Sequence, residues 1–135
     1  MYKHISKSWS KIWKKKTGDI GRKAILWRRE KTITRIDKPS RIDKARRIGY
    51  KAKQGFTVVR IHVGRGGMRR KRPKAGRRPK HLGVTRIKAS ISMQKVAERR
   101  VGKRFPNLKV LNSYFLHRDG KYSWYEVILF DPILA

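Results

Sequence analysis

The sequence predicts an α+β fold in which helices pack against a four-stranded, mainly antiparallel sheet. Two features indicate it: apolar residues recur at helical spacing near the N-terminus and again after residue 90, and the C-terminal part alternates between apolar and polar residues. The expected order is two N-terminal helices followed by β-α-β-α-β-β. A long basic loop is expected between the second strand and the helix that follows it.

The first 31 residues predict a helical N-terminal extension. Its first helix has apolar residues on one face, at Ile5, Trp9, Ile12 and Trp13. A second helix is expected after Gly18, where Ile20, Ala24 and Trp27 form an apolar stripe. Asp19 lies near the positive end of the dipole of that helix.

The next segments predict a strand, a helix and a second strand. Residues 32–37 have the composition of a short strand. Ser40 and Asp43 resemble a capping box, so a short helix is expected to begin there and to end at Gly49. Residues 56–63 are apolar and β-branched on both faces, which indicates a strand in the centre of the sheet.

The last third predicts a helix and a hairpin. Ser90 is the expected N-cap of the helix, which ends near residues 105–106. Its apolar residues are Met93, Val96, Ala97 and Val101. Residues 108–117 and 121–130 alternate in polarity, which is typical of antiparallel strands. Asp119-Gly120 between them predicts a two-residue turn with positive φ.

Positive charge dominates the sequence. The 135 residues include 39 Lys and Arg against 8 Asp and Glu, which gives a formal net charge of +31. Residues 44–97 contain no carboxylate, and within them residues 69–80 read RRKRPKAGRRPK. Such uncompensated charge repels itself in a compact chain, so we expect a polyanionic partner, most simply a nucleic acid. An enzyme for a small neutral substrate gains nothing from this field.

The basic loop is expected to be extended rather than helical. Pro73 and Pro79 lack an amide hydrogen and favour extended geometry at the residue before them. Residues 64–84 form a connection longer than the roughly 12–15 residues beyond which loops are uncommon. Dense Arg and Lys on an extended backbone can follow a line of phosphates, because a guanidinium binds phosphate oxygens through two hydrogen bonds. The alternative is a solvated basic segment or a localisation signal.

Two other segments have alternatives that the sequence leaves open. Residues 51–55, KAKQG, either present two lysines and an amide to a nucleic-acid backbone or form an ordinary loop that turns at Gly55. The aromatic residues of the hairpin either pack in the core or stack on bases. These residues are Tyr114, Phe115, Tyr122, Trp124 and Tyr125.

Several classes of site are not expected. The sequence has no Cys, which excludes disulfides, thiolate nucleophiles and the common zinc sites. Its His residues lie far apart and its carboxylates are scattered, so we expect no metal, no cofactor and no catalytic site. Because no apolar stretch is long enough for a membrane span or a secretory signal, we expect a soluble intracellular protein. We also expect no membrane and no small-molecule substrate among its partners.

Six segments form a familiar series. In chain order they are WRRE (27–30), RIDKARRIGYKAKQG (41–55), FTVVRIHV (56–63), KAGRRPKHLG (74–83), FPNLKVLNSY (105–114) and EVILFDP (126–132). Together they are similar to the archaeal and eukaryotic family of large-subunit ribosomal protein fifteen, which is unrelated to the bacterial protein of the same number. The similarity covers nearly the whole chain. Family members continue past the Asp-Pro at 131–132 into a largely basic extension, whereas this sequence stops at Ala135.

The resemblance implies a structural constituent of the large ribosomal subunit in the cytoplasm, which binds and stabilises large-subunit ribosomal RNA and touches neighbouring ribosomal proteins. We expect one domain over residues 1–135, with the extension at 1–31 and an RNA-binding loop at 64–84. By position, the RNA-binding residues are Arg28, Arg29, Arg41, Lys44, Arg46, Arg47, Lys51, Lys53, Gln54, Arg65, Arg69, Arg70, Lys71, Arg72, Lys74, Arg77, Arg78, Lys80 and His81. The alternative is a free-standing RNA- or DNA-binding module outside the ribosome.

Overall fold

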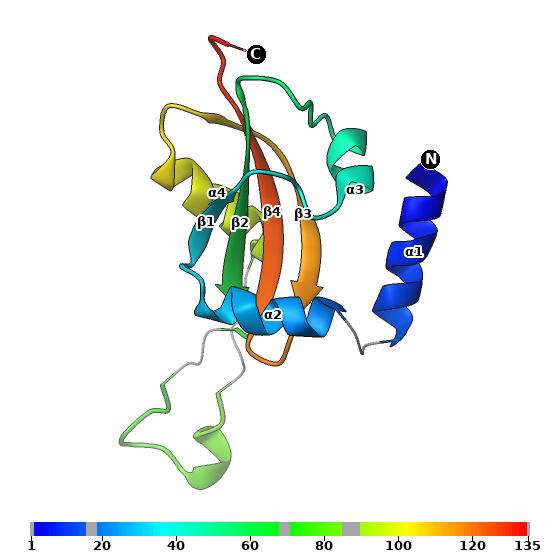
Figure 1. Cartoon of the computed structure of the whole chain (residues 1–135). Helices are drawn as coiled ribbons and strands as arrows, with labels where there is room; N and C mark the ends of the chain where they lie inside the picture. Colours follow the sequence, from blue (N-terminus) through cyan, green and yellow to red (C-terminus); the bar gives the residue numbers. More distant parts are fainter. Residues whose placement is uncertain (1, 16–18, 68–70, 85–89, 135) are drawn as a thin grey trace.

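An antiparallel sheet with helices on both faces forms the body of the protein (Figure 1). The computed structural model describes residues 2–15, 19–67, 71–84 and 90–134. The elements are α1 (Tyr2–Lys15), α2 (Asp19–Arg29), β1 (Ile33–Ile36), α3 (Ile42–Arg47), β2 (Phe56–Gly64), a 3₁₀ turn (Pro79–His81), α4 (Met93–Arg104), β3 (Lys109–Arg118) and β4 (Tyr122–Phe130). The predicted α+β class and the order of the elements are confirmed, and the strand ends lie within one residue of those predicted.

The four strands lie in the order β1-β2-β4-β3, and each neighbouring pair is antiparallel. β2 is therefore an interior strand, as its continuous apolar sequence predicts. β3 lies at one edge, and its register with β4 shifts between Val110 and Asn112 and again between Phe115 and His117. Irregularities of this kind on an edge strand hinder pairing with another chain.

β4 is buried along most of its length, because both faces of the sheet are covered. On one face, α4 packs its Ala97 and Val101 against the strands, and both residues are 0% exposed. This placement confirms the predicted apolar face of α4. The strand residues that meet α4 are Val59, Ile61, Val63, Tyr125, Val127 and Leu129.

Residues of α2 and α3 pack on the opposite face; in Figure 1, α2 crosses in front of the lower ends of the strands and α3 lies to the side of β3. Ala24 and Trp27 of α2 are buried there, so the predicted stripe of that helix is confirmed. Trp27 packs against Trp124 of β4 with ring centroids 6.1 Å apart. The remaining buried members of this cluster are Ala45, Tyr114, Leu116 and Ile128.

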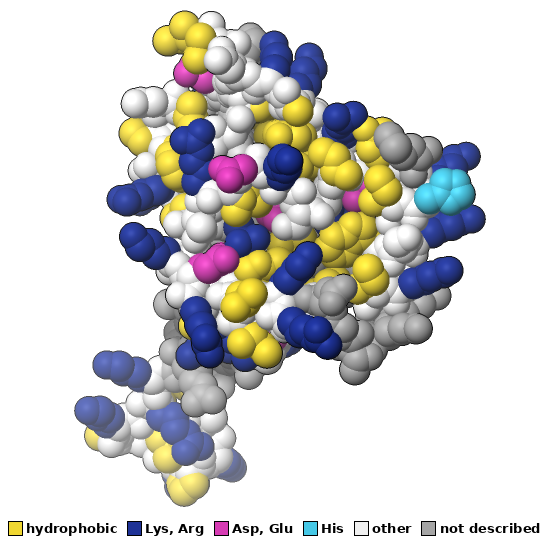
Figure 2. Space-filling view, viewed as in Figure 1, with side chains coloured by type: hydrophobic (Ala, Val, Ile, Leu, Met, Phe, Trp, Pro, Cys, Tyr) yellow, Lys and Arg dark blue, Asp and Glu magenta, His cyan; other side chains and the backbone are white. Residues whose placement is uncertain are grey.

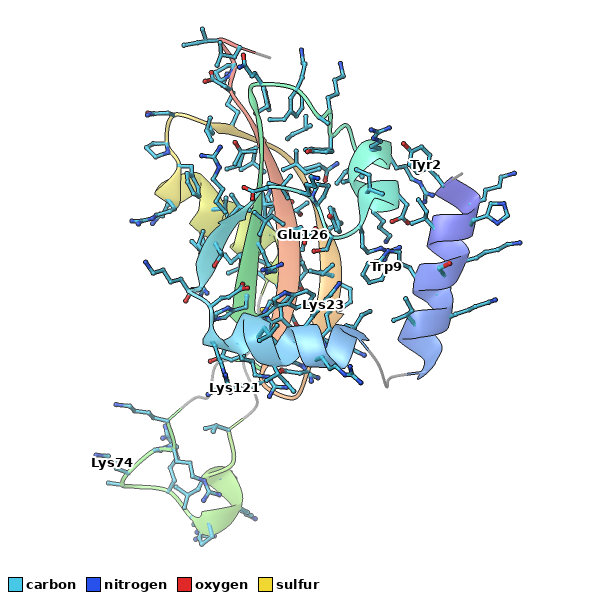
Figure 3. The ribbon with its side chains drawn as sticks, viewed as in Figure 1. Tyr2, Trp9, Lys23, Lys74, Lys121 and Glu126 are labelled. Carbon is cyan, nitrogen blue, oxygen red and sulfur yellow. The ribbon has the colours of Figure 1, made fainter. Side chains whose placement is uncertain are left out.

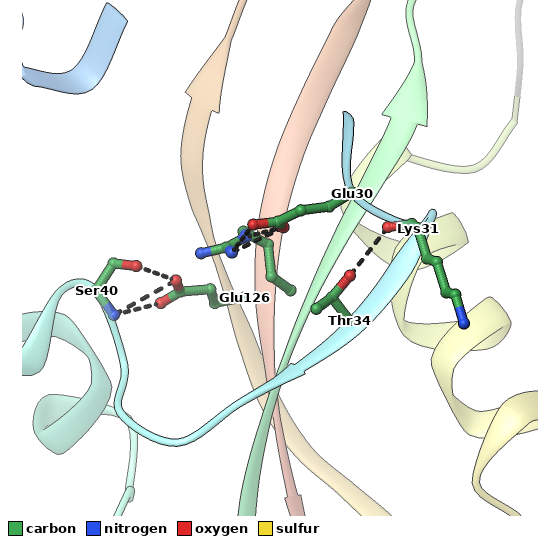
Figure 4. Close-up of polar contacts among 6 residues, drawn as sticks. Glu30, Lys31, Thr34, Ser40 and Glu126 are labelled. Carbon is green, nitrogen blue, oxygen red and sulfur yellow. Dashed lines mark hydrogen bonds and ion pairs between the residues drawn. The ribbon is translucent and has the colours of Figure 1, made fainter. Parts of the chain in front are cut away.

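A carboxylate lies in the middle of this second face. Glu126 of β4 is fully buried and accepts hydrogen bonds from the Ser40 backbone amide (3.1 Å) and the Ser40 hydroxyl (2.6 Å), as Figure 4 shows. It also accepts a hydrogen bond from the Tyr114 hydroxyl. Burial raises the pKa of Glu126, although those hydrogen bonds and the charge of Arg60 oppose the rise. Burial and the neighbouring Glu126 also raise the pKa of Tyr114, so its phenol stays protonated and remains a donor.

Arg60 connects the same face to the end of α2. It pairs with Glu126 in the β2–β4 register, and its Nη2 donates to both carboxylate oxygens of Glu30 at 2.8 Å. Its guanidinium also lies 4.8 Å from the centroid of the Trp27 ring, a cation–π contact. Glu30 directly follows α2, so this ion pair fixes that helix against the sheet.

Two helix starts differ from the sequence prediction. α3 follows Arg41, and no side chain caps it. The predicted capping box of Ser40 and Asp43 is wrong, because the Ser40 hydroxyl binds Glu126 instead. α4 follows Ser92, whose hydroxyl accepts the backbone N–H of Lys95 at 3.2 Å. The predicted cap at Ser90 is therefore wrong by two residues. Both residues are serines, a residue type that commonly caps helices, so residue type alone does not distinguish them.

The end of α3 follows the prediction that Gly49 stops the helix. The Tyr50 N–H donates to the Ala45 carbonyl at 2.9 Å, and the Gly49 N–H donates to the Arg46 carbonyl at 3.2 Å. These two bonds define a Schellman motif, which requires the positive φ of 105° that Gly49 has. The motif reverses the chain and directs residues 50–55 toward the start of β2.

The turn between β3 and β4 is not the predicted two-residue turn. It spans residues 119–121, and Gly120 is not in the positive-φ region. The Asp119 carboxylate shapes the turn instead, because its Oδ1 accepts the backbone N–H groups of Lys121 at 2.7 Å and Tyr122 at 2.6 Å. An Asp side chain that bonds to the backbone two residues ahead stabilises a turn, because it mimics a backbone turn.

We predict that Glu126 contributes strongly to stability. Glu126→Ala leaves the Tyr114 hydroxyl and the Ser40 amide without their buried acceptor, so the free energy of unfolding should fall by about 2–4 kcal/mol. Tyr114→Phe removes only one donor and should cost about 1 kcal/mol. Urea denaturation measures both variants, and a Glu126→Ala protein as stable as wild type contradicts the prediction.

A second prediction concerns pH. Because the pKa of Glu126 is raised in the fold, the folded state holds this proton more tightly than the unfolded chain does. The contribution of Glu126 to stability is therefore greatest below the ordinary Glu pKa and decreases as pH rises through the raised value. Glu126→Gln cannot ionise, so the stability of wild type relative to Glu126→Gln should fall as pH rises above the ordinary Glu pKa of about 4.3. Urea denaturation of both proteins at several pH values measures this stability difference. A difference that increases with pH contradicts the prediction, because it requires a lowered pKa of Glu126.

Candidate nucleic-acid interface

The basic loop projects from the lower end of the sheet in Figure 1, away from the body of the protein. All of its predicted RNA-binding residues within the described part of the chain are exposed, and Figure 2 shows Lys and Arg side chains over this projection. They are Arg65, Lys71, Arg72, Lys74, Arg77, Arg78, Lys80 and His81. Arg69 and Arg70 belong to the same prediction and lie outside the described residues.

The described part of the loop contains no α-helix and is mostly without regular secondary structure. Its one regular element is the 3₁₀ turn at Pro79–His81, where the His81 N–H donates to the Arg78 carbonyl at 2.8 Å. Pro79 stands at the start of that turn, a position that needs no amide donor. The described cations of the loop therefore lie on an irregular chain, with Lys74 on the projecting part (Figure 3).

The base of the loop is held by the β3–β4 turn. The Arg65 N–H donates to the Lys121 carbonyl at 2.9 Å, and the Arg65 guanidinium donates to the Asp119 carbonyl. Asp119 Oδ2 accepts a hydrogen bond from Arg28 Nε at 2.7 Å. Partial burial raises the pKa of Asp119, but the amides of Tyr122 and Lys121 and the Arg28 charge outweigh it, so the pKa is lowered. The ionised carboxylate thus brings Arg28 of α2 beside the start of the loop.

A second group of predicted residues lies at the other end of β2. Its exposed members are Arg46, Arg47, Lys51, Lys53 and Gln54, and Lys44 is partly buried. Arg46 is positioned by Tyr2 of α1, because its guanidinium donates to the tyrosine hydroxyl and lies 5.7 Å from the ring centroid. β2 has nine residues, so at about 3.3 Å per residue this group lies roughly 25–30 Å from the base of the loop.

Arg41 differs from the other predicted residues because it is buried. Its guanidinium donates to Asp43 Oδ2 at 3.1 Å, and only 11% of its side chain is exposed. It also lies 5.1 Å from the ring centroid of Trp9, which stands between α1 and α3 in Figure 3. These contacts hold α1 against α3, and they leave little of Arg41 for a partner.

Further exposed cations lie outside the predicted set. Arg118 precedes the β3–β4 turn and Lys121 is its last residue, beside the base of the loop. The predicted loop position and hairpin turn could have drawn attention to them, but sequence alone does not place the two segments together. Other exposed cations occur on the helices, at Lys3, Lys7, Lys11, Arg22, Lys23, Arg99, Arg100, Lys103 and Arg104.

The aromatic residues of the hairpin serve mainly in the core. Tyr114, Trp124 and Tyr125 are buried, and Phe115 and Tyr122 are partly buried. The described residues include no cluster of three or more His, Asp or Glu able to hold a metal ion. No helix within the described ranges is long and apolar enough to cross a membrane.

Comparison with known proteins identifies the family. A family model described as Ribosomal L15, of the L15e type, matches residues 1–135. The chain belongs to this family. The large ribosomal subunit protein eL15 of Metallosphaera sedula is 48% identical over 132 residues, which are 97% of this chain and 60% of the relative. The chain thus spans about 60% of the length of that relative.

Membership of the L15e family confirms the resemblance inferred from the sequence motifs. The longest of those motifs, residues 41–55, folds as α3, its Schellman motif and the loop that leads to β2. That loop ends at Gly55, which has a φ of 86° and whose carbonyl accepts the Asp131 N–H at 2.8 Å. In this L15e chain, the motif therefore builds a rigid support for the second group of cations.

We predict that Asp119 supports the turn mainly through its bonds to the backbone. Asp119→Asn keeps an oxygen acceptor for the Lys121 and Tyr122 amides and should cost less than about 1 kcal/mol, since the Arg28 side chain of the ion pair is 49% exposed. Asp119→Ala removes that acceptor and should cost about 1–3 kcal/mol. Both variants change the net charge equally, so urea denaturation of the pair isolates the turn. Equal stability of the two variants contradicts the prediction.

Proposed function

We propose that the chain is a structural constituent of the large ribosomal subunit, where it binds and stabilises ribosomal RNA and catalyses no reaction. The observation that carries this proposal is membership of the L15e family together with an exposed basic loop. The relative from Metallosphaera sedula is by its name a protein of the large ribosomal subunit. The net charge of +31 supports a polyanionic partner.

The proposed mechanism is neutralisation of phosphates at two places on the body. The loop, together with Arg28 and Arg29, supplies one group of cations, and the residues from Lys44 to Gln54 supply the other. Each cation that pairs with a phosphate releases a condensed counterion, which favours binding through solvent entropy. Two groups separated by the length of β2 can engage two neighbouring RNA segments and fix their spacing.

We assign residues 1–135 to one domain, with residues 64–84 as an inserted RNA-binding loop. The N-terminal extension proposed at 1–31 is best limited to α1, since Ala24 and Trp27 of α2 belong to the core. Neighbouring ribosomal proteins are further proposed partners, and the cytoplasmic ribosome is the proposed location. Arg41 is excluded from the proposed RNA surface because Asp43 and Trp9 already hold its guanidinium.

The rival proposal, a DNA-binding module outside the ribosome, has weaker support. Recognition of duplex DNA commonly requires a helix that lies in the major groove. α3 has only six residues, and the buried face of α4 packs on the sheet. Competition of ribosomal RNA against duplex DNA of equal length should favour RNA, and a clear preference for the duplex favours the rival.

We predict a steep salt dependence of RNA binding. If about 6–10 phosphates are neutralised, log affinity should fall with log salt with a slope of about −4 to −9. Filter binding of large-subunit ribosomal RNA fragments across a salt series measures the slope. A flat response contradicts the proposal.

Two matched triple variants locate the contacts within that experiment. Replacing Arg77, Arg78 and Lys80 by Gln removes three exposed cations of the loop and should make the slope shallower by about 2–3. The control replaces three exposed cations of α4, Arg99, Lys103 and Arg104, and should change the slope little. Equal changes in both variants contradict the assignment of the contacts to the loop.

A further inference from the structure

A pocket of about 630 Å³ opens where the basic loop leaves the sheet. Its wall combines four elements that are distant in sequence: the start of the loop, the start of α4, the end of β3 and the start of β4. A volume of this size falls within the range of roughly 300–1,000 Å³ that is typical of sites for small organic groups. Among the predicted site residues that the structure describes, only Arg65 lines it.

Part of the pocket lining is aromatic and apolar, beside the polar residues Ser92, Gln94 and Ser123. Phe115 of β3 and Tyr125 of β4 meet edge to face, with ring centroids 5.7 Å apart and an interplanar angle of 68°. Met93 of α4 lies beside them. Phe115 is partly exposed, whereas Tyr125 is only 8% exposed, so Phe115 offers most of the ring surface on which a planar group can pack.

The rim of the pocket carries positive charge. Arg65 and Arg118 line it, and both are exposed residues. The backbone of Arg65 is anchored to Lys121, which fixes the start of the loop beside the pocket. The described residues that form the wall include no carboxylate.

We propose that this pocket binds one unpaired nucleotide of the RNA, with the base against Phe115 and Tyr125 and a phosphate at Arg65 and Arg118. The inference rests on the proposed function and adds a site that binds an unstacked base, whereas the loop contacts only the phosphates of the backbone. Single-stranded nucleotides are commonly recognised by aromatic rings combined with cationic groups that hold the backbone. Continuity with the basic loop favours RNA over an acidic peptide, because the same strand can pass from the pocket onto the loop.

The test uses two fluorescently labelled RNA oligomers of eight nucleotides, one of mixed sequence and one that is abasic throughout. Both carry the same phosphates, so general charge attraction is equal for the two. Fluorescence anisotropy at fixed low salt should show that the full chain binds the oligomer with bases at least about fivefold more tightly, since stacking on one aromatic residue has this magnitude. Equal affinities for the two oligomers overturn the inference.

Three variants locate the preference in the pocket. Phe115→Leu should remove most of the preference for bases, while Phe105→Leu, at the far end of α4, should retain it. Arg118→Gln lies on the exposed rim, where no loss of folding is expected, and should weaken binding of both oligomers more than Arg104→Gln does. Circular dichroism verifies folding of each variant. A preference that survives Phe115→Leu in a folded protein overturns the inference.

Cross-linking separates failure of this inference from failure of the proposed function. Irradiation at 254 nm of the complex with a large-subunit ribosomal RNA fragment should yield cross-linked peptides 110–118 or 122–135, which contain the two rings. Salt-dependent RNA binding without a base preference or these cross-links overturns the pocket alone. Absence of any RNA binding overturns both proposals. If the pocket binds an acidic peptide selectively and does not bind the oligomer with bases, its occupant is a peptide and the nucleotide proposal is wrong.

Discussion

The structure depends on one strand that is covered on both faces. β4 is paired with β2 on one side and β3 on the other, and its residues 123–129 are all buried. One face of the strand is covered by α4, and the other face is covered by α2 and α3. Glu126 lies at the centre of this strand, and its bonds to Ser40 and Tyr114 join the segment before α3 to the neighbouring strand. The small core is thus organised around a strand with a polar group at its middle.

Most of the 8 carboxylates form ion pairs or hydrogen bonds that stabilise the fold. Glu30 binds Arg60, Asp43 binds Arg41, and Asp119 holds the hairpin turn together with Arg28. Glu98 binds Ser113 and Lys95, and these bonds lower its pKa although partial burial opposes them. Because the acids are engaged inside the protein, they do little to neutralise the projecting loop. The cations of the loop therefore remain available to an external polyanion.

Sequence patterns predicted the parts of the fold that arise from regular spacing. Apolar periodicity located α2 and α4, and alternation located the hairpin, because burial of one face imposes that pattern. The caps were harder, since Ser90 and Ser92 share the same chemistry and only the packing of α4 selects between them. The role of Ser40 was also hidden, because its partner Glu126 is distant in sequence. For the candidate interface, composition predicted the exposed loop but not the burial of Arg41 or the pocket, which depend on contacts between distant segments.

The basic loop differs from a basic tail because both of its ends are attached to the same small body. Gly64 ends β2, and Ser92 caps α4, so the projecting chain must leave and return within a short distance. A closed loop has fewer conformations to lose than two free tails of the same length. A single backbone cut near its tip therefore preserves every cation and the core, and yet raises the entropic cost of ordering them along a polyanion. The attachment of both ends of the loop to the body should therefore favour binding, in addition to its positive charge.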